Sequence, residues 1–285
     1  MKTFAESFFL MIGFFTRLPV PKIEFTDERY RKAMIFLPLV GLVIGAVLAL
    51  IQMFLVFVET PQILIGAVLT CAYIFLSGGL HFDGLADTCD GFFSGRSREQ
   101  ALEIMKDSRI GVFGTLGLFM AGIFYFALFT QVSVLGLLVF PLCGRACCLI
   151  SASLAPYARE EGMGKATSER GGAGSVLSAI VSIIGASFLT IPLAKLVILM
   201  GARFEPLLTV GASEFPAAFT GVAISFITIA AQLAAGAAVL VTVYMTMSFK
   251  KRLGGVTGDT FGAVIEVSSL VFMFVFILLW KAFSL

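Results

Sequence analysis

Long apolar runs separated by short polar connections dominate the pattern of this chain. A run of about 20 apolar residues is long enough to cross the hydrocarbon core of a bilayer as a helix. Stretches of this kind occur at 34–57, 62–80, 110–130, 132–155, 174–199, 219–247 and 263–284. The pattern therefore predicts an all-α, polytopic membrane bundle of about seven transmembrane helices.

The apolar segment at 7–15 is too short to span a bilayer. It is followed by Arg17, Pro19 and Pro21, so we expect a helix that lies in the membrane interface. No small-residue cleavage site follows it, and Glu6 interrupts its basic flank. These features argue against a secretory signal peptide.

Composition supports the membrane assignment. Hydrophobic residues make up 59% of the chain, charged residues only 13%, and the mean hydropathy is +1.01. Soluble domains are about 45–50% apolar, even with glycine counted. We find no second soluble domain, long linker or repeat unit, so residues 1–285 are expected to form one membrane-embedded domain.

The basic residues are distributed unequally between alternate connections. One set of connections carries most of them, at 22–32, 96–109, 159–170 and 250–252, whereas the other set holds Arg203 and Lys281. Since cytoplasmic loops carry the excess of Lys and Arg, we expect a protein of the cell (inner) membrane whose N-terminal side faces the cytoplasm. The polar, Gly-rich connections 81–109, 156–173 and 248–262 then form a cytoplasmic working surface.

Three aspartates lie within eight residues, at Asp83, Asp87 and Asp90. In a helix their carboxylates would fall within an arc of about 60° and repel one another unless a cation neutralised them. Mg²⁺ prefers such oxygen ligands and shares its coordination shell with water and substrate phosphates. The spacing therefore predicts a magnesium site for phosphoryl chemistry. The alternative is a solvated acidic segment, because Gly84 and Gly91 are poor helix formers.

The segment that follows predicts a short amphipathic helix over 98–106, because Ser97 and Gln100 have the spacing of a capping box. Asp107 and Arg109 come directly after it. We interpret them as a phosphate clamp beside the metal, with the guanidinium as a planar donor. A charged rim that anchors the next span is the alternative interpretation.

Arg145 lies near the middle of an apolar run, where an ionised group is costly and by default indicates a functional site. Pro141 and Gly144 suggest that the helix is broken there and admits water. The alternative is a buried structural pair between Arg145 and Glu266.

The glycines of the loop 253–263 could expose backbone N–H groups to a phosphate, with Thr257 and Asp259 as additional oxygen ligands. A simple Gly-rich turn before the last span is the alternative. The loop 156–173 is interpreted only as a flexible connection of mixed charge.

The sequence gives little support for a zinc site or for a hydrolytic site that depends on histidine. His81 is the only histidine, so we assign it a structural or substrate hydrogen-bonding role. The five cysteines form no C-x-x-C pair and are expected to be free thiols.

Several motifs occur in a fixed order along nearly the whole chain. They are T-R-L-P-V-P at 16–21, F-L-P-L-V-G at 36–41, H-F-D-G-L-A-D-T at 81–88 with D-G at 90–91, M-K-D-S-R-I-G at 105–111, Y-A-R at 157–159 with G-M-G at 162–164, and G-G at 254–255 with T-G-D at 257–259 and G-A at 262–263. The chain thereby resembles the cobalamin 5′-phosphate synthase family, also called adenosylcobinamide-GDP ribazoletransferase.

The resemblance implies a Mg²⁺-dependent transfer, late in cobalamin (vitamin B12) synthesis, from adenosylcobinamide-GDP to α-ribazole or its 5′-phosphate, with release of GMP. Our hypothesis for the mechanism is that Asp83 and Asp87 hold Mg²⁺, with Asp90 as a second metal ligand or the base. We further expect catalytic roles for Asp107, Arg109 and Arg145 and substrate binding by Arg159, Gly255, Thr257, Gly258 and Asp259. Phe82 stands where many relatives of the family carry Glu or Leu, so a fourth acidic ligand is not expected there.

Two other classes deserve comparison. A secondary transporter would also use intramembrane charges such as Arg145 and Glu266, but here the charged motifs gather at one face of the membrane. Phosphotransferases of nucleotide-linked lipid alcohols use a D-G-x-x-A-R signature, which the segment D-G-L-A-D-T at 83–88 does not match, because Asp87 and Thr88 stand where the signature has Ala and Arg. We expect small-molecule substrates and the lipid bilayer as partners and no nucleic acid, and leave a homo-oligomer open.

Overall fold

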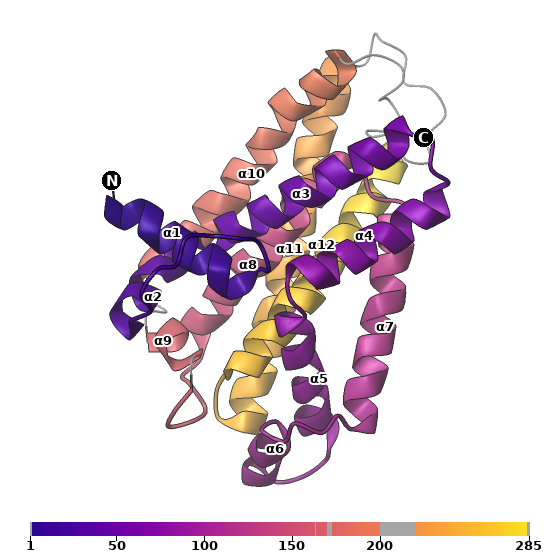
Figure 1. Ribbon diagram of the computed structural model, residues 1–285. Helices are drawn as coiled ribbons and strands as arrows, with labels where there is room; N and C mark the ends of the chain where they lie inside the picture. Colours follow the sequence, from indigo (N-terminus) through magenta and orange to yellow (C-terminus); the bar gives the residue numbers. More distant parts are fainter. Residues whose placement is uncertain (1, 163, 170–172, 200–219, 284–285) are drawn as a thin grey trace.

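The computed structural model describes the whole chain except residues 1, 163, 170–172, 200–219 and 284–285 (Figure 1). The described part is helical and has no strand, which confirms the predicted fold class. Its elements are α1 (Lys2–Phe15), α2 (Asp27–Ala33), the 3₁₀ turn η1 (Met34–Phe36), α3 (Leu37–Phe57), α4 (Gln62–Leu76), α5 (Leu80–Phe93), α6 (Arg98–Ile104), α7 (Val112–Phe129), α8 (Val134–Leu154), α9 (Gly164–Glu169), α10 (Ala173–Leu199), α11 (Thr220–Leu253) and α12 (Gly258–Phe283).

Five helical segments of the described chain are long and apolar enough to cross a membrane, or six if α4 and α5 are one bent span. They are Asp27–Phe57, Val112–Phe129, Val134–Leu154, Phe226–Leu253 and Gly258–Ala282. The expected count of seven is not confirmed, because the described apolar stretch of α10, Gly174–Phe188, is shorter than a span. Apolar side chains such as Val112, Phe119 and Leu240 cover the outer faces, as lipid contact requires.

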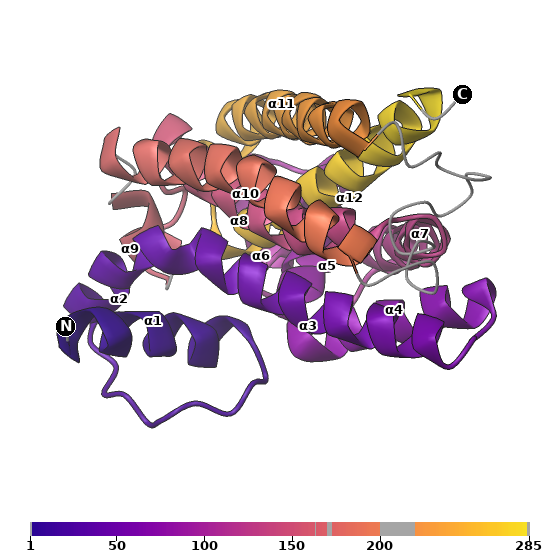
Figure 2. The ribbon, with the colours of Figure 1, turned by 90° about the horizontal axis from the view of Figure 1, so that it is seen from above.

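Helix α8 forms the centre of the bundle, with α3, α10, α11 and α12 packed around it (Figure 2). In the apolar stretch of α8, 89% is buried inside the bundle. The predicted break at Pro141 and Gly144 is wrong, since α8 runs without interruption through both residues. Gly144 instead permits close packing, because a Cβ atom there would come within 2.7 Å of the main-chain oxygen of Ile265 on α12.

The acidic segment forms a helix, as predicted, and its position depends on two features. Helices α4 and α5 meet at a bend of 87° (Figure 1). Gly78 and Gly79 supply this bend with φ values of +63° and +72°, a region that favours glycine. Helix α5 then crosses α12 closely, because a Cβ atom on Gly84 would lie 2.8 Å from the main-chain oxygen of Asp259. The bend and the crossing bring the acidic helix to the N-terminal end of α12.

The predicted short helix is also confirmed as α6. Ser97 accepts a hydrogen bond from the Gln100 amide, and the Gln100 side chain accepts one from the Ser97 amide, which completes the capping box. Helix α1 lies beside α2 at the side of the bundle (Figure 2), and its Phe4 and Phe9 are exposed. Its placement in the membrane interface stays a prediction.

Candidate active site

The two later polar connections are joined by backbone hydrogen bonds. Ala158 N donates to Val256 O at 2.8 Å, and Val256 N donates to Pro156 O at 2.9 Å. Gly255 is required at this contact, because any Cβ atom there would collide with the Pro156 carbonyl. The connection 156–173, which we interpreted as flexible, is therefore fixed at its start, and the glycine predicted to bind phosphate has a packing role.

This backbone pairing brings Arg159 to the first turn of α12. Its Nη2 atom lies 2.8 Å from Oδ2 of Asp259, and both side chains are largely buried. Thr257 supports the carboxylate, since its Oγ1 donates to the same oxygen at 3.3 Å. Thr257 also caps α12 by accepting a hydrogen bond from the Thr260 amide at 3.2 Å. Two of the predicted binding residues, Arg159 and Asp259, are thus direct partners.

Helix α5 presents its acidic face to this pair. Asp83 is exposed and Asp87 is partly buried. The charge of Asp87 interacts with those of Asp83, Asp259 and Asp90, and with the opposite charge of Arg159. The structure therefore brings together carboxylates from two helices and one arginine from a loop. Such a concentration of negative charge favours the binding of a cation.

Asp90 has a different environment from the other two aspartates of α5. Its Oδ2 accepts a hydrogen bond from Gly111 N at 2.7 Å, and its Oδ1 accepts one from Gly114 N at 2.9 Å. Both carboxylate oxygens thus accept hydrogen bonds from amides at the start of α7. The helix dipole also stabilises a negative charge at this end of the helix. The geometry makes Asp90 a helix cap that ties α5 to α7, and its expected role as a metal ligand or base stays a prediction.

The donor set of the site fits a magnesium ion bound in part by substrate. In the described part of the chain no three His, Cys, Asp or Glu side chains are grouped as ligands of one ion. Mg²⁺ needs only one or two protein carboxylates, because water and phosphate oxygens complete its octahedral shell. Asp83 and Asp87, four residues apart on one helix, are the two that fit this requirement.

Asp107 and Arg109 form an exposed pair in the connection between α6 and α7. Arg109 Nη2 lies 2.7 Å from Asp107 Oδ2, and the Arg109 side chain is 87% exposed. Hydrogen bonds from Arg109 lower the pKa of the Asp107 carboxyl to about 2. The two residues neutralise each other in this geometry, and their contact with a phosphate stays a prediction.

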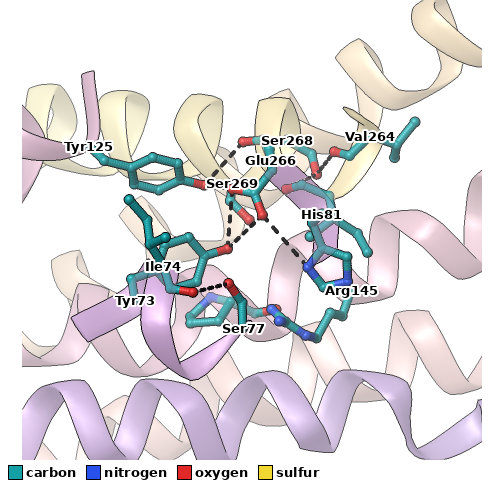
Figure 3. A network of polar contacts seen from close by, with 12 residues as sticks. Tyr73, Ile74, Ser77, His81, Tyr125, Arg145, Val264, Glu266, Ser268 and Ser269 are labelled. Atoms are coloured by element: carbon teal, nitrogen blue, oxygen red, sulfur yellow. Dashed lines mark hydrogen bonds and ion pairs between the residues drawn. The ribbon is translucent and has the colours of Figure 1, made fainter. Parts of the chain in front are cut away.

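Arg145 lies in a fully buried polar cluster within the bundle (Figure 3). The centre of the cluster is Glu266, which accepts hydrogen bonds from the hydroxyls of Tyr73 at 3.1 Å and Tyr125 at 2.5 Å. His81 Nδ1 is 3.7 Å from the same carboxylate. Arg145 Nη1 donates to the Pro141 carbonyl at 3.1 Å.

No ion pair within 4.0 Å joins Arg145 to Glu266, although both are described and completely buried. Two further guanidinium nitrogens of Arg145, Nε and Nη2, have no hydrogen-bond partner in the described part of the chain. The structure thus places Arg145 among buried residues around Glu266, and it does not bring Arg145 to the carboxylates of α5. Tyr73 and Tyr125 are members of this cluster that sequence reasoning missed, because a tyrosine in an apolar run carries no distinctive signal.

Fold and site together define a multi-pass helical membrane protein with a carboxylate-lined site where its polar connections meet. The family model described as cobalamin-5-phosphate synthase matches residues 7–277. The chain therefore belongs to the cobalamin-5-phosphate synthase family.

Relatives named adenosylcobinamide-GDP ribazoletransferase match over nearly the full length. The protein of Acetivibrio thermocellus is 36% identical, over 94% of this chain and 96% of its own. That of Fusobacterium nucleatum subsp. nucleatum is 31% identical, over 96% and 98%, and that of Shigella boydii serotype 4 is 33% identical, over 94% and 98%. No solved structure matches the chain.

Proposed function

We propose that this protein transfers the cobinamide phosphoryl group of adenosylcobinamide-GDP to α-ribazole or α-ribazole 5′-phosphate and releases GMP. The observation that carries the proposal is the family match over residues 7–277. Relatives that bear this transferase name and align over nearly their whole length support it. The carboxylates and the arginine gathered at one end of the bundle are the groups that such phosphoryl chemistry uses.

The reaction balances as a single displacement. A ribazole hydroxyl oxygen forms a bond to the phosphorus that carries cobinamide, and the bond from that phosphorus to the diphosphate bridging oxygen breaks. GMP leaves with the electron pair, and the hydroxyl proton passes to an acceptor in the site. Asp259 is a carboxylate available for that proton, since it lines the cavity described below and is not one of the two carboxylates that we propose for the metal.

We further propose that Asp83 and Asp87 hold Mg²⁺ when the donor is bound. The ion would supply neutralisation of the charge on the diphosphate. The chain itself orients the carboxylates through the contact of Gly84 with α12. Arg159, held by Asp259, adds a positive group at the same place. Asp107 and Arg109 are proposed to contact the donor from the α6–α7 connection.

We propose that the site faces the cytoplasm across the cell membrane. The unequal distribution of Lys and Arg between alternate connections supports this orientation. Cysteine labelling can test it in a Cys-free background with single cysteines at the exposed position Arg96 and at Glu59. A membrane-impermeant reagent applied to intact cells should label only the Glu59 position, and the reverse pattern would refute the orientation.

The transfer is tested with detergent-purified protein, adenosylcobinamide-GDP, ribazole phosphate and Mg²⁺, with GMP release as the measurement. We expect GMP release that EDTA abolishes and Mg²⁺ restores. Asp87→Asn should lower turnover by about 100-fold or more, as loss of a catalytic metal ligand does. Glu99→Gln, an exposed substitution on α6, is the control and should leave turnover unchanged.

Three results would contradict these proposals separately. Absence of GMP release by folded wild-type protein would refute the transfer reaction. Turnover that persists in EDTA would refute the metal. Near-normal turnover of Asp87→Asn would refute the assignment of that ligand while leaving the reaction in place.

A further inference from the structure

A cavity of ≈ 140 Å³ lies between the N-terminal helices and the crossing of α5 with α12. Its lining combines two kinds of side chain. Phe14, Phe15 and Tyr30, from α1 and α2, contribute aromatic rings, and Asp83 and Asp259 contribute carboxylates. The helices α1 and α2 have no part in the metal site, so their contribution to this cavity requires an explanation.

The aromatic part of the lining is an ordered wall of rings. Phe14 meets Tyr30 edge to face, with ring centroids 5.1 Å apart. Phe15 stacks on Tyr30 at 6.5 Å and on the imidazole of His81 at 5.8 Å, with interplanar angles of 27° and 25°. Phe15 and Tyr30 are almost completely buried, and Phe14 is half-buried. Neighbouring rings therefore fix this wall before any ligand binds, as a site for a flat apolar group requires.

We propose that this cavity binds the acceptor of the transfer, with the fused aromatic base of ribazole against Phe14, Phe15 and Tyr30. The ribose then extends toward Asp83 and Asp259, whose carboxylates accept hydrogen bonds from its hydroxyls. This assignment rests on the proposed function, because that function defines the two candidate ligands of the cavity, the donor adenosylcobinamide-GDP and the acceptor ribazole. It makes α1 and α2 the part of the protein that recognises the acceptor base.

The chemistry of the wall favours the benzimidazole base of ribazole over the other rings present in the reaction. Guanine presents several donors and acceptors at its edges, and burying them without partners would be costly. Phe14, Phe15 and Met34 offer no side-chain hydrogen-bond donor to satisfy them. The other polar side chains of the lining apart from the carboxylates, Tyr30, His81 and Thr167, are too few to pair every donor and acceptor of guanine. The corrin ring is far larger than the cavity. A benzimidazole presents a hydrocarbon edge and two faces, which aromatic neighbours accommodate well.

The position of the cavity also suits the direction of attack. Asp83 belongs both to the cavity wall and to the acidic face of α5. A ribose hydroxyl directed to this carboxylate therefore lies at the junction between the acceptor cavity and the place proposed for the diphosphate. Its oxygen can form the new bond to phosphorus as the bond to GMP breaks, with the proton passing to Asp259.

The test compares Phe14→Ala with Phe9→Ala in purified protein. Phe9 lies on the same helix, is exposed and is not part of the cavity wall. Equilibrium binding of α-ribazole 5′-phosphate is measured by calorimetry, and the KM for each substrate is measured from GMP release. We expect Phe14→Ala to weaken ribazole phosphate binding about tenfold, with the KM for adenosylcobinamide-GDP within about twofold of wild type. Phe9→Ala should change neither quantity.

Phe14→Leu serves as a second variant if the alanine substitution lowers the yield of folded protein, since it removes the ring and retains apolar volume. Unchanged ribazole phosphate binding in a folded Phe14 variant would overturn the assignment. A selective rise in the KM for the donor would also overturn it, because the cavity would then hold guanine. If wild-type protein releases no GMP, the proposed function fails, and calorimetry still decides whether ribazole phosphate occupies the cavity.

Discussion

The guanidinium Nε of Arg98 donates a hydrogen bond to the main-chain carbonyl of Leu253 at 2.8 Å, across 155 residues of sequence. Its Nη2 donates to the carbonyl of Ala158 at 3.3 Å. Gly254 makes room for this side chain, since a Cβ atom there would lie 2.7 Å from Nε, and its φ of +79° favours glycine. One arginine therefore joins the polar connections that carry Arg159 and Asp259.

We predict that Arg98→Ala lowers kcat/KM by about tenfold, because loss of these hydrogen bonds frees the connections that place Arg159. Arg98→Lys should recover only part of the activity, since an ammonium group cannot reproduce the planar donor fork. Arg96→Ala, an exposed change two residues earlier, is the matched control. Equal activity of Arg98→Ala and Arg96→Ala in GMP release would show that the bridge has no positioning role.

Gly84→Ala should separate α5 from α12 and reduce both stability and activity. The added methyl group would meet the main-chain oxygen and Cα of Asp259 at 2.8 and 3.0 Å, and backbone atoms cannot yield as a flexible side chain can. Overpacking of this kind costs about 1–3 kcal/mol.

Gly122→Ala on α7 is the matched control, because its Cβ atom would meet nothing within 4 Å. Thermal unfolding in detergent should show a lower Tm for Gly84→Ala than for wild type. The Tm of Gly122→Ala should be unchanged. Similar Tm values for the two variants would mean that the helices are not in the close contact described.

The buried cluster predicts coupling between Arg145 and Glu266. Removing one member of a buried charged group leaves the other uncompensated, at a cost of about 3–5 kcal/mol. Arg145→Met and Glu266→Gln should therefore each destabilise the protein, and the double variant should lose less than the sum of the two. The measurement is the free energy of unfolding in a double-mutant cycle. Wild-type stability of Arg145→Met with lost turnover would instead support the catalytic role expected from sequence.

The low pKa of Asp107 in its pair with Arg109 predicts that this carboxyl does not contribute to the pH profile of kcat/KM near neutral pH. The pKa of Asp107 is lowered from 3.8 to about 2, so any stabilisation from its charged form is present above its ordinary pKa and is lost as the pH falls toward 2. Asp107→Asn should therefore leave the shape of the pH profile of kcat/KM unchanged between about pH 5 and 8.

If the pair also contacts the donor, Arg109→Ala should raise the KM for adenosylcobinamide-GDP while the Tm stays constant, because exposed ion pairs contribute little to stability. Arg31→Ala on α2 is the control for loss of a basic residue from the same set of connections. An unchanged KM for adenosylcobinamide-GDP in Arg109→Ala would contradict the proposal that Asp107 and Arg109 contact the phosphates of the donor.

The sequence by itself determined the elements and the kind of chemistry. Apolar runs specify membrane helices because no unpaired backbone group is tolerated in lipid. The capping box at Ser97 specifies α6 because its hydrogen bonds are local. The clustered aspartates of α5 indicate a cation because successive like charges spaced four and three residues apart lie on one face of a helix and repel one another.

Only the tertiary structure decided which of these polar residues act together. It assigned Asp90 to the first amides of α7, placed Arg145 beside Glu266, and joined Arg159 to Asp259 through a backbone pairing of distant loops. These partners are separated by tens to more than a hundred residues, and the glycine contacts that bring them together depend on backbone positions in space. The charged residues of a site can be recognised from their local spacing in the sequence. Which of them become partners depends on how the helices pack.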